Sequence, residues 1–82
     1  MICMRITEVT ETTRDTRKRL EAKSDIELAK FLMDVDHSIR AGFEHAIYFQ
    51  EWSVGTDILK KRGYEIYQTS DVAEILSSLQ EA

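Results

Sequence analysis

Two histidines and three carboxylates gather near the middle of the chain, and they are the residues best suited to metal or acid–base chemistry. They are Asp34, Asp36, His37, Glu44 and His45. Asp34 and His37 stand three residues apart, a spacing that puts a carboxylate and an imidazole on one helix face, where they could chelate a metal ion. Asp36 falls on another face, and His45 lies beyond the expected end of that helix. An ordinary solvated face accounts for this set, so we expect no metal site, no cofactor and no catalytic site.

The other residue types with reactive chemistry stand alone. Cys3 has no histidine near it in sequence, and a single cysteine cannot form an internal disulfide. Gly42, Gly55 and Gly63 are isolated, so each is expected to be a helix cap or turn and none belongs to a phosphate-binding loop. No run approaches the roughly 18–20 apolar residues needed to cross a bilayer. The sequence therefore predicts a non-enzymatic protein without a membrane segment, in a cytoplasmic setting.

Eight basic residues form two groups that could bind the phosphates of a nucleic acid. The first group alternates with Glu11, Asp15 and Glu21, a pattern that predicts ion pairs within one helix. The second falls in the last turn of an expected helix, where cations offset the negative end of the helix dipole. Because the formal net charge is −4, we expect nucleic-acid binding only as the alternative function. The groups are Arg14, Arg17, Lys18, Arg19 and Lys23, and then Lys60, Lys61 and Arg62.

The clearest helix that the sequence predicts spans residues 24–41. Ser24 and Glu27 have the spacing of a capping box, in which each side chain accepts a hydrogen bond from the other residue's backbone N–H. An apolar stripe at spacings of four, three and four lines one face of this helix, which should therefore be buried. The stripe consists of Leu28, Leu32, Val35 and Ile39.

Residues 1–23 form a charged N-terminal arm, for which two structures compete. A helix could begin near Thr7 and run on into the next one, because neither Pro nor Gly interrupts the chain before Gly42. Against this helix stand the β-branched residues between Ile6 and Thr16, which lower helix propensity. We predict the helix, kinked or frayed near Lys23, while the alternative makes residues 1–9 a strand and residues 10–23 a loop.

The C-terminal half reads as a strand over residues 44–50, a short helix over 53–62, a strand over 64–68 and a last helix capped by Ser70 or Asp71. Aromatic and β-branched residues favour the two strands, and Gly63 should end the short helix with a positive φ. The sequence thus predicts one domain over residues 1–82. Its fold class is α/β, with α+β possible, and residues 24–82 form a helix plus a β-α-β-α unit.

Self-association is expected, because two strands alone are marginal and the apolar stripe exceeds what so small a chain can cover. The interface candidates are Leu28, Leu32, Val35 and Ile39, together with Trp52, a residue type enriched at binding hot spots. Trp52 fits the hydrophobic core equally well. The expected partners are a second copy of the chain and another protein, while nucleic acid and membrane are not expected.

Residues 36–42 (DHSIRAG) and 58–66 (ILKKRGYEI) carry a resemblance that covers about residues 7–68. The pattern resembles small uncharacterised proteins of bacteriophages and prophages, which have a charged N-terminal helix, a strand, a short helix and a Gly-Tyr strand. The resemblance implies a protein of viral or mobile-element origin, located in the host cytoplasm or the virion. Such a protein would be a virion component or a modulator of a host protein, and no functional residues are implied.

Overall fold

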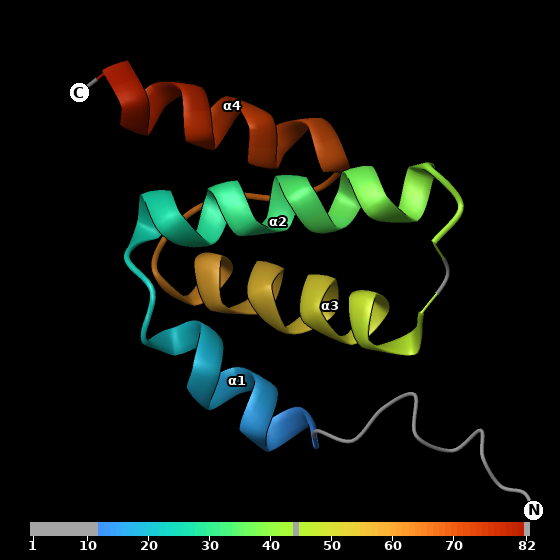
Figure 1. Ribbon diagram of the computed structural model, residues 1–82. Coiled ribbons are helices and arrows are strands. Elements are labelled where there is room, and N and C mark those ends of the chain that lie inside the picture. Colours follow the sequence, from blue (N-terminus) through green and yellow to red (C-terminus); the bar gives the residue numbers. More distant parts are fainter. Residues whose placement is uncertain (1–11, 44, 82) are drawn as a thin grey trace, which may run out of the picture.

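The computed structural model describes residues 12–43 and 45–81, and these residues fold into four α-helices (Figure 1). They are α1 (Thr13–Glu21), α2 (Asp25–Arg40), α3 (Ala46–Lys61) and α4 (Thr69–Glu81). None of the described residues lies in a strand. The expected α/β or α+β fold with a β-α-β-α unit is therefore wrong, because this part of the chain is all helical.

The helices pack in the order α1, α3, α2, α4 (Figure 1). The central pair, α2 and α3, is an antiparallel hairpin, and each member carries one outer helix: α1 packs on α3, and α4 packs on α2. A linker, residues 62–68, leads from the end of α3 to the start of α4, which runs antiparallel to α2. As a result α1 and α4 lie at opposite edges of the molecule.

A break at residues 22–24 separates α1 from α2. Ser24 has an extended backbone, and the predicted capping box is confirmed: the Ser24 hydroxyl accepts from the Glu27 N–H at 3.3 Å, and the Glu27 carboxylate accepts from the Ser24 N–H at 3.0 Å. The interruption expected near Lys23 is present, but the prediction of one kinked helix is wrong, because the capping box starts a new helix and the chain turns back. The alternative loop is wrong for residues 13–21, and any strand or helix within residues 1–11 lies outside the described residues. Nor does α1 project as an arm, since Thr16 and Leu20 are fully buried.

The predicted strand over residues 44–50 is wrong, because α3 begins at Ala46 and runs through to Lys61. The local preference of Ile47, Tyr48 and Phe49 for a strand is weak compared with tertiary packing. Buried or partly buried residues continue through this segment at helical spacing, which lets one helix face pack against α1 and α2. These residues are Ile47, Glu51, Val54, Ile58 and Leu59.

Gly55 was expected to be a helix cap or a turn, and this prediction is wrong. The residue lies inside α3 at its crossing with α2. A Cβ atom at this position would lie 2.5 Å from Cδ2 of Leu32, which is itself fully buried. The absence of a side chain therefore lets the two central helices approach closely.

The helix ends predicted at Gly42 and Gly63 are confirmed, with φ of +99° and +107°. After α3, the Gly63 N–H donates to the Lys60 carbonyl at 3.0 Å and the Tyr64 N–H donates to the Leu59 carbonyl at 3.1 Å. This pair of bonds is the Schellman motif, which needs a left-handed residue.

The predicted strand over residues 64–68 is also wrong, because this segment is the linker and pairs with no described strand. Ile66 anchors it in the core at 6% exposure. The last helix begins at Thr69, so Ser70 and Asp71 lie inside its first turn. The Asp71 carboxylate accepts hydrogen bonds from the N–H groups of Tyr67 and Gln68, at 2.7 and 3.0 Å, just before the helix.

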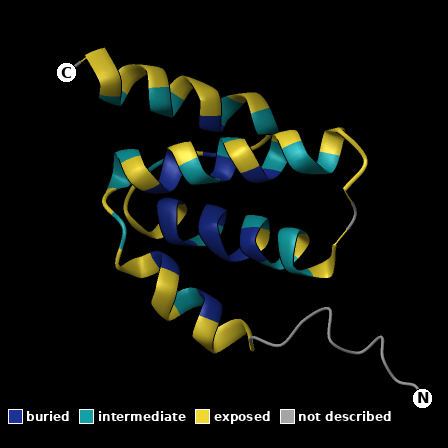
Figure 2. Cartoon of the chain, in the orientation of Figure 1, coloured by how far each residue is buried: buried dark blue, intermediate teal, exposed yellow. Residues whose placement is uncertain are grey.

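Buried residues gather on α2 and α3, while α4 is exposed over most of its surface (Figure 2). The stripe residues Leu28 and Leu32 are fully buried and Val35 is 4% exposed, within this one chain. The expectation that the stripe needs a partner for burial is therefore wrong. The core comprises Leu20, Leu28, Ala29, Leu32, Val54, Ile58, Leu59, Ile66 and Val72.

Candidate functional site

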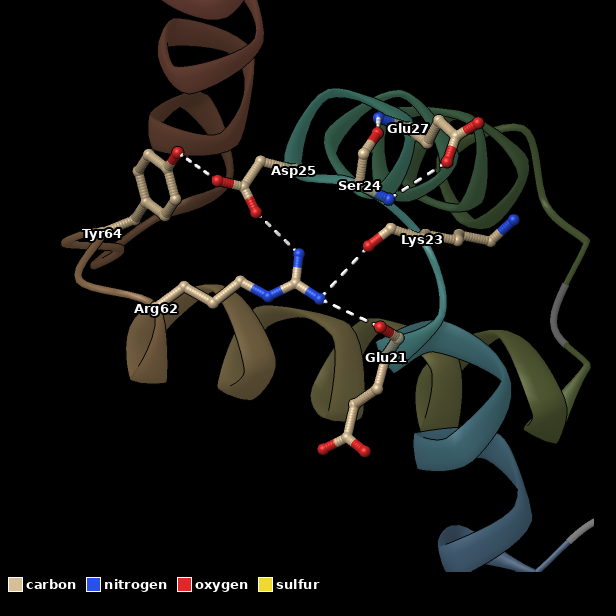
Figure 3. A network of polar contacts seen from close by, with 7 residues as sticks. All are labelled: Glu21, Lys23, Ser24, Asp25, Glu27, Arg62 and Tyr64. Carbon is tan, nitrogen blue, oxygen red and sulfur yellow. Dashed lines mark hydrogen bonds and ion pairs between the residues drawn. The ribbon is translucent and has the colours of Figure 1, made fainter.

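A polar network joins the end of α3 to the turn between α1 and α2 (Figure 3). The Arg62 guanidinium donates to Oδ1 of Asp25 at 2.6 Å and to the carbonyl oxygens of Glu21 and Lys23, each at 3.2 Å. The Tyr64 hydroxyl donates to the other carboxylate oxygen, Oδ2 of Asp25, at 2.6 Å. Arg62 thereby gives a partner to the carbonyl of Glu21, the last residue of α1, and to that of Lys23 in the break after it.

The pKa values in this network move away from neutrality. The hydrogen bond from Tyr64, followed by that from Arg62, lowers the pKa of Asp25 below its ordinary value. The same bond to Asp25 raises the pKa of Tyr64. Asp25 is therefore ionised and Tyr64 protonated at neutral pH, which suits a fixed clamp between helices better than a group that exchanges protons.

Ion pairs between helices hold α1 on α3. Arg17 contacts Asp57 at 2.9 Å, and Arg19 contacts Glu51, which is 7% exposed, at 2.7 Å. Lys61 also contacts Asp57, at 3.5 Å, and the hydrogen bond from Arg17 is the main cause of a lowered Asp57 pKa. Arg17 and Arg19 therefore pair with carboxylates of α3 and not, as expected, with Asp15 or Glu21 of their own helix. Glu11, the third expected partner, lies outside the described residues.

The structure brings the two basic groups of the sequence to one side of the molecule, but most of their charges have partners. Lys23 lies 5.2 Å from the centre of the Phe31 ring, and Arg62 belongs to the network with Asp25. Arg14, Lys18 and Lys60 are exposed, and no ion pair joins them to another described residue.

The metal-ligand candidates do not converge. Asp36 pairs with Arg40 at 2.9 Å, and His45 begins α3 with its ring edge against Tyr48, at 5.4 Å between ring centres. Asp34 and His37 are exposed. Among residues 12–43 and 45–81, no three His, Cys, Asp or Glu side chains are grouped so that they could hold a metal ion. Glu44 and Cys3 lie outside the described residues.

An aromatic surface remains on α3 and the linker. Tyr67 is 84% exposed and Phe49 is 51% exposed. Trp52 is partly buried against the core, and it lines a pocket together with Tyr67 and Lys60. Phe49 precedes Trp52 by three residues, so the two are neighbours on the helix surface. We call Phe49, Trp52 and Tyr67 the aromatic face.

Of the predicted interface residues, only Trp52 belongs to this surface. Leu28, Leu32 and Val35 are buried in the core, and Ile39 is partly buried. The sequence reading missed Phe49 and Tyr67 because it assigned both to strands. For Phe49 the signal is its spacing of three residues from Trp52, which places the two side by side on a helix. The sequence offers no comparable signal for Tyr67.

A second surface lies along α4. A groove of about 220 Å³ separates this helix from residues 64–65. It combines partly buried apolar side chains with carboxylates, and its lining includes Tyr64, Ile75, Leu79, Glu65, Asp71 and Glu74.

Charge changes sign across the row of helices. The edge helix α1 carries four Arg or Lys residues against two carboxylates. In α3 two carboxylates balance two lysines, in α2 four carboxylates exceed one lysine and one arginine, and α4 carries three carboxylates and no Lys or Arg. The molecule therefore has one basic edge and one acidic edge.

None of the described helices has the length and apolar character that a membrane span requires. Comparison of the chain with protein-family models, curated proteins and solved structures found no match. The resemblance to phage and prophage proteins gains no support from these comparisons.

Proposed function

We propose that this is a non-enzymatic interaction protein that self-associates through its aromatic face. The observation that carries the proposal is the exposure of Tyr67 and Phe49 beside Trp52 on one surface of a chain whose core is already complete. Large exposed aromatic side chains in one patch are typical of binding surfaces, and Trp and Tyr dominate binding hot spots.

The low number of charged side chains on the aromatic face favours a second copy as the partner. In a twofold contact the same face of each copy meets that of the other, so an excess of one charge on that face causes repulsion between the copies. Both carboxylates of α3 pair with arginines of α1, and Lys60 is the charged side chain that lies beside Trp52 and Tyr67. Because a long lysine side chain can keep its charged end in water, another copy of this face can approach at little cost. A twofold contact through α2 or α4 would instead bring an excess of carboxylates together. Each aromatic residue also occurs twice in a contact through the aromatic face, and each can bury about 150–250 Å².

The polar network at Asp25 supports a non-enzymatic role. Arg62 and Tyr64 occupy both carboxylate oxygens of Asp25, and the pKa values of Asp25 and Tyr64 shift away from neutral pH. Groups used for proton transfer usually have pKa values near the working pH. The network instead fixes the end of α3 against the turn between α1 and α2.

Sedimentation equilibrium of a double variant, Phe49→Ser with Tyr67→Ser, tests the proposal. Both side chains are largely exposed, so the variant should keep its fold and lose association. The control is Phe43→Ser, which removes an aromatic side chain that is 58% exposed in the turn between α2 and α3. We expect wild type and the control to approach twice the chain mass with rising concentration, and the double variant to stay at one chain mass. Identical masses for all three proteins would contradict the proposal.

Nucleic-acid binding is a second candidate, favoured by one observation: Arg17 and Lys61, from the two basic groups, both contact Asp57. Exposed Arg14, Lys18 and Lys60 would supply the free charge for phosphates. Neutralising these three residues with glutamine should then remove salt-dependent DNA or RNA binding. Absence of such binding in wild type at physiological salt would eliminate this candidate.

A further inference from the structure

We infer that the groove along α4 is a second, separate binding site, which takes a basic amphipathic segment of another protein. This site lies on the acidic edge of the molecule and shares no residue with the aromatic face. Its use does not depend on self-association.

The apolar part of the groove is left incomplete by the packing of α4. This helix is an edge element that packs mainly on α2, and Val72 is its one buried residue among those described. Ile75 and Leu79, four residues apart on one face, stay partly exposed and line the groove with Tyr64. An apolar side chain placed there would complete the burial of these three residues.

The carboxylates of the groove favour a partner segment with positive charge. Glu65 and Glu74 are exposed at the groove, Asp71 lies beside them, and α4 has no Lys or Arg to neutralise them. The neighbouring helix α2 carries four carboxylates against one lysine and one arginine, so carboxylates outnumber cations in these two helices. A segment with Lys or Arg beside its apolar residues would meet both features, while an acidic or purely apolar segment would meet only one.

The partner is another protein and not the described surface of a second copy. The basic helix α1 is the only described helix with excess positive charge, but its apolar Leu20 is fully buried against the core. The residues of α1 that remain exposed are mainly charged and would leave the apolar part of the groove unfilled.

A synthetic peptide of about 14 residues, with Leu at helical spacing on one face and Lys on the other, provides the probe. The comparison peptide has the same composition in scrambled order, which keeps the charge and removes the apolar face. Fluorescence anisotropy of labelled peptides would measure their affinity for wild type and for two variants of equal charge. Glu74→Lys changes the groove, whereas Glu81→Lys changes the same helix outside the groove.

We expect the amphipathic peptide to bind wild type at least tenfold more tightly than the scrambled peptide. Glu74→Lys should weaken this binding about tenfold, and Glu81→Lys by less than about threefold, because only a groove carboxylate meets the bound lysines. Leu79→Asn should also weaken binding while the circular-dichroism spectrum stays helical. Equal binding of both peptides, or equal loss in both lysine variants, would overturn the inference and indicate general attraction to an acidic protein. Stronger binding after removal of residues 1–11 would also overturn it, since the chain's own N-terminal segment would then be the occupant.

Discussion

At the scale of single residues, the polar contacts of this protein connect segments that are distant in sequence. Arg62 and Tyr64 meet Asp25 across 37 and 39 residues, and Arg19 meets Glu51 across 32. Sequence spacing predicts contacts within a helix, such as the capping box of Ser24 and Glu27, because both partners share one element. It cannot predict which helices will later face each other. For this reason the pairs expected with Asp15 and Glu21 were wrong for Arg17 and Arg19, which contact α3, although the charged residues were identified.

Removal of the Tyr64 hydroxyl tests the residue scale. Tyr64→Phe should raise the pKa of Asp25 toward its ordinary value and lower the free energy of unfolding by under about 1 kcal/mol, because the bond is only part-buried. The folded-state pKa of Asp25 is lowered, so its contribution to stability is present above the unfolded pKa, near 4, and is lost as pH falls through the folded value. The stability difference between wild type and variant should therefore shrink in acid.

Denaturant unfolding at neutral and acidic pH measures this difference. Tyr67→Phe is the matched control, because its hydroxyl belongs to a side chain that is 84% exposed. A constant difference across the acid range, or an equal effect of both variants, would show that Tyr64 does not stabilise the ionised Asp25.

At the scale of elements, the sequence predicted helix boundaries better than it predicted whether a segment is helix, strand or linker. The capping box at Ser24 and the glycines at positions 42 and 63 act through local geometry, so they could be read without the fold. Residues 44–50 and 64–68 were read as strands because their β-branched and aromatic residues suit a strand locally. In the structure the first segment continues the buried face of α3, and the second is an irregular linker whose Ile66 joins the core. Tertiary packing decided both cases.

Gly63→Ala tests the end of α3. The variant should lose about 1 kcal/mol of unfolding free energy, because a residue with a Cβ disfavours the positive φ of this position. No atom lies within 4 Å of the added Cβ, so the cost comes from the backbone alone. Gly63→Asn should cost less, since Asn tolerates the left-handed region better. Thermal melts of the three proteins would refute this explanation if alanine and asparagine destabilise equally.

Gly55→Ala tests the crossing of α2 and α3, and its sign should depend on Leu32. In wild type the added Cβ would meet the Leu32 side chain, and overpacking should cost about 1–3 kcal/mol, more than the helix propensity of alanine returns. In a Leu32→Ala background the obstructing atoms are gone, so the same substitution should stabilise by up to about 1 kcal/mol. A double-mutant cycle in denaturant measures both steps, and the same sign in both backgrounds would contradict this account of the crossing.

At the scale of the whole molecule, the row of helices separates two surfaces. The aromatic face lies on α3 and the linker, where Lys60 is the charged side chain beside Trp52 and Tyr67, and the acidic groove lies along α4 at one edge. The sequence predicted self-association and Trp52 as a contact residue, but it placed the rest of the interface on Leu28, Leu32, Val35 and Ile39. Leu28, Leu32 and Val35 are buried within a single chain, so charged substitutions at these three positions should unfold the protein before they affect any assembly.

The fluorescence of Trp52 measures the central proposal directly, because Trp52 is the single tryptophan of the chain and belongs to the aromatic face. If two copies meet through this face, the partly exposed indole loses contact with water. Its emission should then move to shorter wavelength as protein concentration rises, in parallel with the increase in mass, and the double variant Phe49→Ser with Tyr67→Ser should show no such shift. An emission maximum of wild type that stays constant from dilute to concentrated solution, while the mass rises, would place the contact elsewhere and contradict the account.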